Sequence, residues 1–358
     1  MAVVGRISVI GWVETAAIRV IRAIRGSDEE PGVRVLCTLI AISVACISTA
    51  QVPSQRDTIR TDVDLVVIPA SVKDSQGRFV YDLQQQDFII VEDGRRQQIQ
   101  QFSIDPAPLS AAVLVDTAIG GSALRRFSSA IVALSSAFTP MDEAEIYRFD
   151  KFVTKLSDFT SSEDVMESSL DAVKKMSEQM HEAWSPLAVF PGRGPRWLRK
   201  ILDSGVDTRL LNAAVFAAAR DLEKRPVEKR KIILAISDGQ NAQSEFRFQD
   251  IRDRLVEKQI QFFAVTVAFP VLDKTTSVLR TYADATGGDV YSGRTQSSMQ
   301  AAFSLITEQA RHEYVLSYVS NNEVSGSLPA LRKVQVQTTR PGLKVHHRTE
   351  YLQFPPRR

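Results

Sequence analysis

Apolar strand-like runs alternate with helix-like stretches from residue 111 to about residue 310, and this alternation constrains the fold more than any other feature. Residues 111–116 (AAVLVD) and 230–238 (RKIILAISD) are almost continuously apolar up to a final acid, as strands buried on both faces are. Strands that alternate with helices form right-handed βαβ units around a mostly parallel sheet. The sequence therefore predicts a doubly wound, Rossmann-like α/β domain over residues 108–311. Its helices are expected at 123–138, 162–181, 208–224, 246–259, 274–286 and 296–310.

Two β-rich segments flank this domain. Residues 61–107 have alternating strand patterns and an Asp93-Gly94 pair typical of a hairpin turn, and they predict a small β-meander. Residues 312–354 predict two or three more strands. An isolated hairpin buries little apolar surface, so we expect the two segments to pair into one discontinuous β-sandwich with the α/β domain inserted.

Residues 1–50 precede the folded part. An apolar core at about 35–47 is followed by Ser48 and Ala50, which are spaced like the small residues of a signal-peptide cleavage site. This pattern predicts export to the periplasm, envelope or medium after cleavage near Ala50, followed by a linker at 51–60. The alternative is an uncleaved membrane anchor at 35–50, although the run is short for a membrane span.

The first 32 residues have the pattern of a basic amphipathic helix, which is either a membrane-surface segment or an upstream extension outside the natural protein. The formal net charge is +2, and no basic stripe with interleaved aromatics occurs, so we expect no nucleic-acid partner. Both cysteines, Cys37 and Cys46, lie in the N-terminal segment. This excludes a disulfide framework or a thiolate metal site after residue 46.

Two of the predicted buried strands end in an aspartate, Asp116 and Asp238. Ligands of doubly wound sheets bind beyond the carboxyl ends of the strands, so we expect these two acids to lie close together. Neighbouring carboxylates repel each other unless one is protonated or a cation bridges them. Mg²⁺ or Mn²⁺ with oxygen ligands would meet this requirement.

The sequence resembles a von Willebrand factor type A (vWA) domain protein over roughly residues 60–354, most closely the secreted bacterial "VWFA-related" proteins of the Acidobacteria type. The resemblance is carried by the order of several phrases: VKDSQGRFVYDLQQQDFIIVEDGRRQQIQQF, VLVDT, KIILAISDG, YADATGGDVY and HEYVLSYV. It implies the parallel α/β fold, with strands on both sides of it, and a role in protein binding or adhesion.

In this family, a metal-ion-dependent adhesion site has the pattern Asp-x-Ser-x-Ser, then a Thr in a central loop and an Asp after a later strand. The resemblance implies Asp116, Thr208 and Asp238 as the metal ligands here. Ala118 and Gly120 occupy the two serine positions, so the site is degenerate.

Ser122 stands two residues late, and it could replace a lost ligand if the loop is longer than usual. Thr117 is present but points away from the ion in the family. Two alternatives follow: the site binds Mg²⁺ or Mn²⁺, or Asp116 and Asp238 serve as hydrogen-bond acceptors for loop amides without metal.

We therefore expect an exported protein-interaction or adhesion module that binds a protein partner at the carboxyl edge of its sheet. The alternative is a metal-free structural or scaffolding protein of the envelope. Metal-dependent capture of a partner would separate the two.

The sequence predicts no enzyme, because no nucleophile-elbow, zinc-protease or phosphate-loop motif occurs. A hydrolase with an unrecognised site is the remote alternative. His346 and His347 are adjacent on a predicted strand, so their side chains should point to opposite faces. His181 and His312 are expected at the surface.

The segment 184–206 has three prolines and is expected to be a surface insertion or a lid. The acids of the predicted meander are expected to be turn and edge residues. They are Asp82, Asp87, Glu92 and Asp93.

Overall fold

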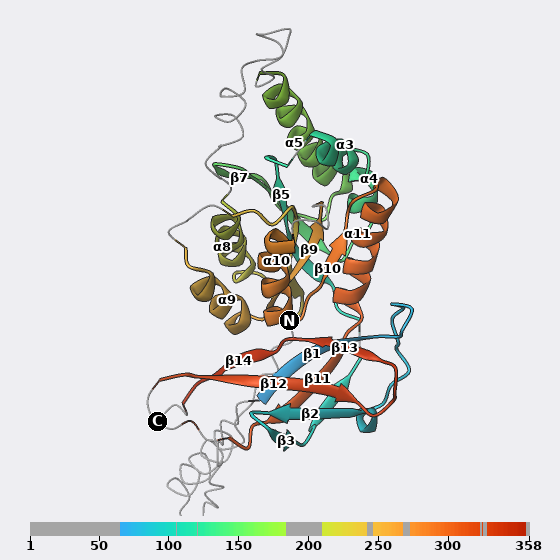
Figure 1. Cartoon of the computed structure of the whole chain (residues 1–358), viewed down its shortest axis with the longest axis vertical. Coiled ribbons are helices and arrows are strands. Elements are labelled where there is room, and N and C mark those ends of the chain that lie inside the picture. The colour runs from blue at the N-terminus through green and yellow to red at the C-terminus, as the bar shows by residue number, and fades with distance from the viewer. Residues whose placement is uncertain are drawn as a thin grey trace, which may run out of the picture. The chain divides into compact units, whose positions relative to one another are not determined.

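The computed structural model describes residues 65–104, 106–119, 121–183, 210–241, 246–267, 273–322, 324 and 328–355. The predicted signal segment, linker and 184–206 insertion lie outside these ranges. Figure 1 shows an α/β part and an all-β part. Within the described ranges, no helix combines the length and the apolar character needed to cross a membrane.

A six-stranded sheet forms the centre of the α/β part, in the order β10-β9-β8-β5-β6-β7. Its neighbouring strands are parallel except for the pair β6 and β7. All eight residues of β5 are buried, because helices cover both faces of the sheet. The strands are β5 (Leu109–Asp116), β6 (Glu143–Phe149), β7 (Val153–Thr160), β8 (Arg230–Ser237), β9 (Ile260–Thr266) and β10 (Val290–Ser292).

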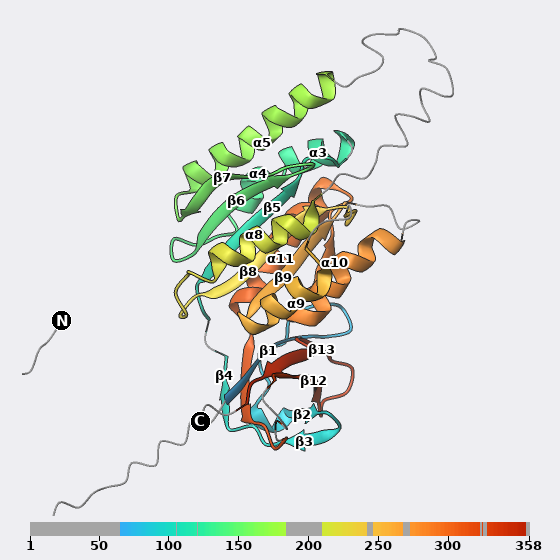
Figure 2. The same ribbon diagram turned by 90° about the vertical axis from the view of Figure 1, so that its left-hand side faces the viewer.

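The two helical layers bury alternate residues of the strands. Val113 and Val115 of β5 join one hydrophobic core, whereas Ala112 and Leu114 join the other. Figure 1 shows the sheet between the two layers, and Figure 2 shows α8 and α9 in front of the sheet. The first layer contains α3 (Gly121–Ser128), α4 (Ile131–Ser135), α5 (Glu163–Ala183) and α11 (Gln296–Arg311). The second contains α8 (Leu211–Leu222), α9 (Phe248–Glu257) and α10 (Asp273–Thr286).

The single helix predicted at 123–138 is wrong, because α3 and α4 are separate helices. The Ser129 hydroxyl donates to the Arg126 carbonyl at 2.8 Å. The Ala130 amide donates a hydrogen bond to the Phe127 carbonyl instead of to the Arg126 carbonyl. A serine hydroxyl that competes for a backbone carbonyl in this way favours a break in the helix.

Two four-stranded sheets form the all-β part, in the orders β13-β1-β11-β4 and β14-β12-β2-β3. Strands from both flanking segments pair in each sheet, as β1 with β11 and β2 with β12. The buried faces share one core that includes Ile68, Ile90, Leu316 and Val334. The strands are β1 (Leu65–Lys73), β2 (Phe88–Glu92), β3 (Arg95–Gln97), β4 (Gln101–Ser103), β11 (Tyr314–Val319), β12 (Ala330–Thr338), β13 (Lys344–His347) and β14 (Glu350–Gln353), with a 3₁₀ turn η1 (Gln85–Asp87) before β2.

The fold class is the one that the sequence predicted, a doubly wound parallel sheet with flanking β strands. The meander expected at 61–107 is wrong, because its strands divide between the two sheets. The chain crosses after β1 so that the apolar faces of β1 and β2 can meet across one core. The hairpin of β2 and β3 has the expected turn, with φ of 47° at Asp93 and 82° at Gly94.

The chain passes between the two parts twice, before β5 and after α11. Asp142 holds both crossings, because its carboxylate accepts the Leu109 amide at 2.7 Å and pairs with Arg311 at 2.6 Å. Arg230 at the start of β8 donates to the carbonyl of Arg311 at 3.0 Å and lies 3.6 Å from Glu313. These contacts tie the crossings to the amino ends of the parallel strands.

Glu313 is fully buried at this junction, and burial raises its pKa from 4.5 to about 7 against the opposing effects of Arg230 and Gln261. Between these two values the folded chain binds more protons than the unfolded chain, so the free energy of unfolding falls as the pH rises. We expect Glu313→Gln to stabilise the protein by up to about 3 kcal/mol at about pH 8 and by little at about pH 5. Urea unfolding at both pH values, with the exposed Glu257→Gln as the control, checks this. Equal effects of Glu313→Gln at the two pH values would contradict it.

Candidate functional site

Asp116 and Asp238 lie at the same edge of the parallel sheet, as their positions in the sequence predicted. Asp116 ends β5, and Asp238 follows β8, the neighbouring strand. The Ser237 hydroxyl donates to Asp116 Oδ2 at 2.8 Å. Asp116 is completely buried, and its Oδ1 accepts the Ala118 amide at 3.0 Å. The first strand-end carboxylate therefore holds both its own loop and the end of β8.

The loop after β8 is organised by the same kind of hydrogen bond. The Ser237 hydroxyl accepts the Gly239 amide at 3.0 Å while it donates to Asp116. Asp238 Oδ1 accepts the Gln240 amide at 3.1 Å. Gly239 has a φ of 81°, which a glycine adopts without a steric penalty. The turn leaves Asp238 half-buried at the rim.

A third acid, Asp150, lies at the same edge of the sheet. It is not among the residues that the sequence predicted for this site. It follows β6 and is buried. Its Oδ2 accepts the Thr117 hydroxyl at 3.1 Å and the Arg148 guanidinium at 3.0 Å, and its Oδ1 accepts the Phe152 amide at 2.8 Å. The signal was available, because the strand EIYRF also ends in an acid.

Asp150 fixes a hairpin tip that carries an exposed aromatic ring. Phe149 pairs with Val153 across the hairpin, and the Asp150 amide donates to the Phe152 carbonyl at 3.0 Å. The Phe152 ring is 61% exposed, with Lys151 Nζ 5.5 Å from its centre. An apolar ring and a cation are thus presented on a well-anchored turn.

The described residues do not by themselves make a closed cation site. Both Asp116 oxygens accept hydrogen bonds from the chain, and Ala118 supplies no side-chain oxygen. Thr208 lies outside the described residues, as does the side chain of Ser122 in α3. Among the described residues, no group of three or more His, Cys, Asp or Glu could hold a metal ion.

The histidines lie away from this edge where their side chains are described. His346 and His347 point to opposite sides of β13, as predicted. His346 Nδ1 is 3.6 Å from Asp289, and His347 accepts the Val336 amide at 3.1 Å. Burial lowers the pKa of His346 to about 4, so this ring is neutral at pH 7. His312 packs edge-on against Tyr81.

This chain is similar to several solved structures at low identity. A von Willebrand factor type A protein from Catenulispora acidiphila has 9% identity and a TM-score of 0.41, with 82% of this chain and 74% of that chain covered. BatB from Bacteroides thetaiotaomicron has 12% identity and a TM-score of 0.38, with 56% and 99% covered. Proximal thread matrix protein 1 from the mussel byssus, with a zinc-occupied MIDAS motif, has 13% identity and a TM-score of 0.40, with 62% and 50% covered. No protein-family model and no curated protein matches the chain. The fold assignment rests on the strand order and the helical layers described above.

Proposed function

We propose that the chain is a vWA-type protein-interaction module of the secreted bacterial "VWFA-related" kind, and that it binds a protein partner at the carboxyl edge of its parallel sheet. The observation that carries the proposal is the placement of three strand-end acids, Asp116, Asp150 and Asp238, on neighbouring strands along that edge. Their hydrogen bonds order the adjoining loops, and a pre-ordered surface binds a partner at a lower entropic cost.

The hairpin tip at the same edge supplies a contact of the kind that dominates protein interfaces. Exposed aromatic side chains on well-ordered backbone are the usual anchors of such interfaces. Phe152 has this character, and Lys151 beside it favours an acidic group on the partner. The partner we propose therefore has an apolar socket bordered by a carboxylate.

We propose that this edge works without a bound metal ion. An ion held by Asp116, Thr208 and Asp238 would compete with the two hydrogen bonds that Asp116 already accepts. Mg²⁺ or Mn²⁺ bridging to an acid of the partner is the alternative, and it requires Thr208 to complete the ligand set. A metal-free scaffolding role in the envelope, through other surfaces, is the second candidate function.

Two further parts of the proposal rest on the sequence. The apolar segment at 35–47 supports export, with cleavage near Ala50 or retention as an anchor. The absence of known catalytic motifs from the sequence supports a binding protein over an enzyme.

Capture of envelope proteins by the immobilised chain tests the binding edge. We expect Phe152→Ala to reduce the amount of the captured partner by about tenfold or more, because aromatic anchors carry much of the binding energy. Val227→Ala is the matched control, since Val227 is 86% exposed and precedes β8 at the opposite edge of the sheet. Each capture is repeated with EDTA, which we expect to leave the captured set unchanged.

The outcomes separate the candidates. Loss of capture in EDTA would overturn the metal-free edge and favour an ion between Asp116, Thr208 and Asp238. Equal capture by the Phe152→Ala and Val227→Ala variants would overturn binding at the carboxyl edge and favour the scaffolding role.

A further inference from the structure

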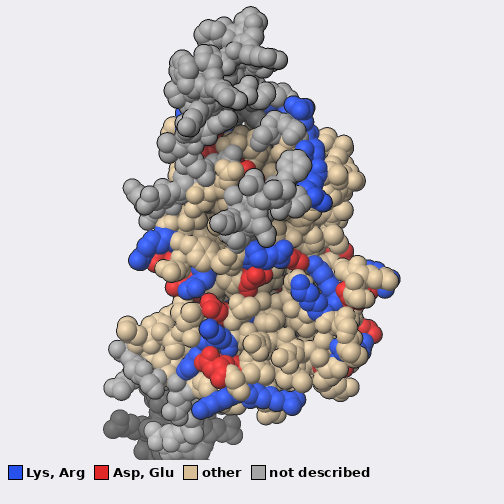
Figure 3. Space-filling view, in the orientation of Figure 1, with Lys and Arg blue, Asp and Glu red and all other residues tan. Residues whose placement is uncertain are grey.

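The segment TGGDVY, residues 286–291, lies where the α/β part meets the β-sandwich. Its contacts have no role in the proposed binding site at the carboxyl edge of the sheet. The segment links the end of α10 to β10 at the amino edge of the parallel sheet. Figure 3 shows acidic and basic side chains close together across the middle of one face of the molecule. Ion pairs join the two parts, including Lys73 with Asp289 and Arg252 with Glu350.

Asp289 is shared by cations from both parts. Lys73 of the sandwich strand β1 donates to Asp289 Oδ2 at 3.0 Å and to the Tyr291 hydroxyl at 2.8 Å. Arg280 of α10 donates to Asp289 Oδ1 at 2.8 Å. Burial is the largest single effect and alone would raise the pKa of Asp289, but the charge and hydrogen bond of Lys73, together with His346 and the Val290 amide, outweigh it and hold that pKa below its usual range. One buried carboxylate therefore joins the sandwich to α10 and β10.

Gly287 contacts the point where the chain passes from one sandwich sheet to the other. β13 pairs with β1, whereas β14 pairs with β12, so residues 347–350 form the corner between the sheets. A Cβ on Gly287 would lie 2.7 Å from the Arg348 nitrogen and 3.1 Å from the His347 carbonyl carbon. Backbone therefore packs against backbone at this point, which only glycine permits.

The corner itself is held from both sides. The Arg348 guanidinium is buried, donates to the Val67 carbonyl of β1 and lies 5.9 Å from the centre of the Tyr351 ring. The Thr349 hydroxyl donates to the Asp284 carbonyl of α10 at 3.3 Å.

The α/β side of the motif is equally fixed. The Thr286 hydroxyl accepts the Phe262 amide of β9 at 2.9 Å and donates to the Tyr282 carbonyl at 2.8 Å. Thr286 thus anchors the turn to the sheet, while Gly287 and Asp289 reach the sandwich.

We propose that residues 286–291 are a docking motif that binds the β-sandwich to the amino edge of the parallel sheet, so that the two parts unfold as one cooperative unit. Linked domains with small polar interfaces ordinarily move and unfold separately. Here a backbone contact, a shared carboxylate and two chain crossings act together. The seated sandwich covers the amino edge and leaves the carboxyl edge for a partner.

Replacement of Gly287 by alanine in the full chain tests the motif. Gly342→Ala is the matched control, because Gly342 has a φ of 76° against 86° for Gly287 but nothing within 4 Å of its added Cβ. Both variants place an alanine at a positive φ and so carry the same conformational penalty. Only in Gly287→Ala does the added methyl group clash with the backbone of the corner at residues 347–350. Differential scanning calorimetry is expected to give one transition for the wild type and for Gly342→Ala, and two for Gly287→Ala.

Hydrogen exchange provides the second readout. Amides of β1 and β13 are expected to exchange about tenfold or more faster in Gly287→Ala than in Gly342→Ala, because undocking exposes the sandwich. If Gly287→Ala does not fold, Lys73→Met is tested in its place. We expect two calorimetric transitions that lie closer together, and a smaller increase in amide exchange in β1 and β13. Two transitions in the wild type would overturn the proposal. So would one transition with equal exchange in the Gly287→Ala and Gly342→Ala variants, or an unchanged Lys73→Met variant.

Discussion

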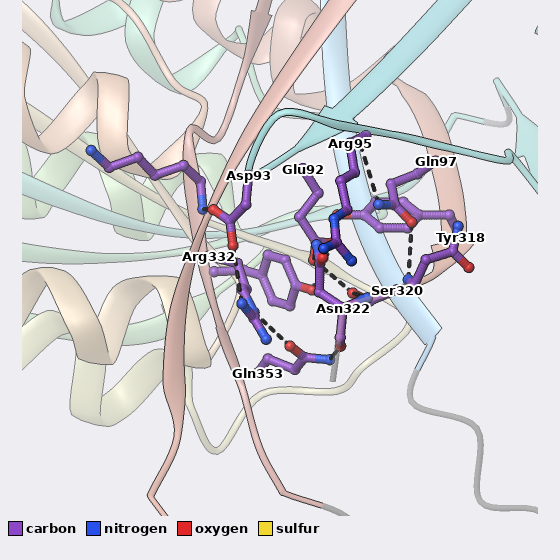
Figure 4. Close-up of polar contacts among 12 residues, drawn as sticks. Glu92, Asp93, Arg95, Gln97, Tyr318, Ser320, Asn322, Arg332 and Gln353 are labelled. Carbon is purple, nitrogen blue, oxygen red and sulfur yellow. Dashed lines mark hydrogen bonds and ion pairs between the residues drawn. The ribbon is translucent and has the colours of Figure 1, made fainter. Parts of the chain in front are cut away.

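Glu92→Leu is expected to lower the free energy of unfolding by about 4 kcal/mol or more, because several buried donors lose one shared acceptor. Glu92 has no exposed surface and ends β2 inside the sandwich. Its Oε2 accepts the hydroxyls of Tyr318 at 2.7 Å and Tyr351 at 2.9 Å. Its Oε1 accepts the Ser320 hydroxyl at 2.6 Å and the Asn322 amide at 2.7 Å. Figure 4 shows Glu92 with Tyr318, Ser320 and Asn322 around it.

The size of the effect follows from the number of donors. A buried donor left without a partner costs about 1–3 kcal/mol. Three buried donors and the half-buried Ser320 hydroxyl surround this carboxylate. Urea unfolding measures the loss. Tyr318→Phe removes one donor and keeps the carboxylate, so we expect it to cost about 1 kcal/mol. Equal losses from Glu92→Leu and Tyr318→Phe would show that the carboxylate is not the common acceptor.

Glu92 also shows where local sequence patterns mislead. It was expected to be an edge residue of a meander. The alternation of Phe88, Ile90 and Glu92 places all three on the buried face of β2, so its burial could have been predicted. Its partners could not, because Tyr318 and Tyr351 lie more than 220 residues away along the chain. Hydrogen bonds between such distant residues leave no periodic signal.

The α/β part was predicted well for the opposite reason. Its strands and most of its helices follow from local apolar periodicity, and the rule that parallel strands present their carboxyl ends together placed Asp116 beside the end of β8. The break between α3 and α4 was not predicted, since it depends on the orientation of one hydroxyl, that of Ser129.

The candidate site was predicted in position but not in detail. That Asp116 and Asp238 share an edge follows from topology alone. The bond from the Ser237 hydroxyl to Asp116 depends on the rotamer of one serine, which a sequence pattern does not encode. This bond bears on the proposed metal-free edge, because it occupies an oxygen that a metal ion would need.

Gly288→Ala is expected to lower the free energy of unfolding by about 3 kcal/mol or more, because the added methyl group would meet rigid backbone. Its Cβ would lie 2.0 Å from the Phe262 carbonyl oxygen and 2.7 Å from the carbonyl carbon. Gly288 lies outside the positive-φ region, so alanine could adopt its backbone conformation without strain. The predicted loss is therefore steric, and it falls on the pairing of β9 with β10, where the Ala264 amide donates to the Asp289 carbonyl at 3.0 Å.

Gly293→Ala separates this cause from a general effect of crowding around the outer strand β10, because Gly293 follows that strand and Gly288 precedes it. Its Cβ would lie 2.6 Å from Val265 Cγ1 and 2.9 Å from Met299 Cε, which are side-chain atoms. The methionine tip can turn away, so that the valine methyl group has only a small shift left to make, whereas a strand carbonyl can move only if the strand moves. We therefore expect Gly293→Ala to cost about 1–2 kcal/mol in urea unfolding, clearly less than Gly288→Ala. A larger loss of stability for Gly293→Ala than for Gly288→Ala would mean that the backbone of the turn before β10 moves more easily than the packed side chains of Val265 and Met299. Backbone contact at Gly288 would then not be what fixes β10 against β9.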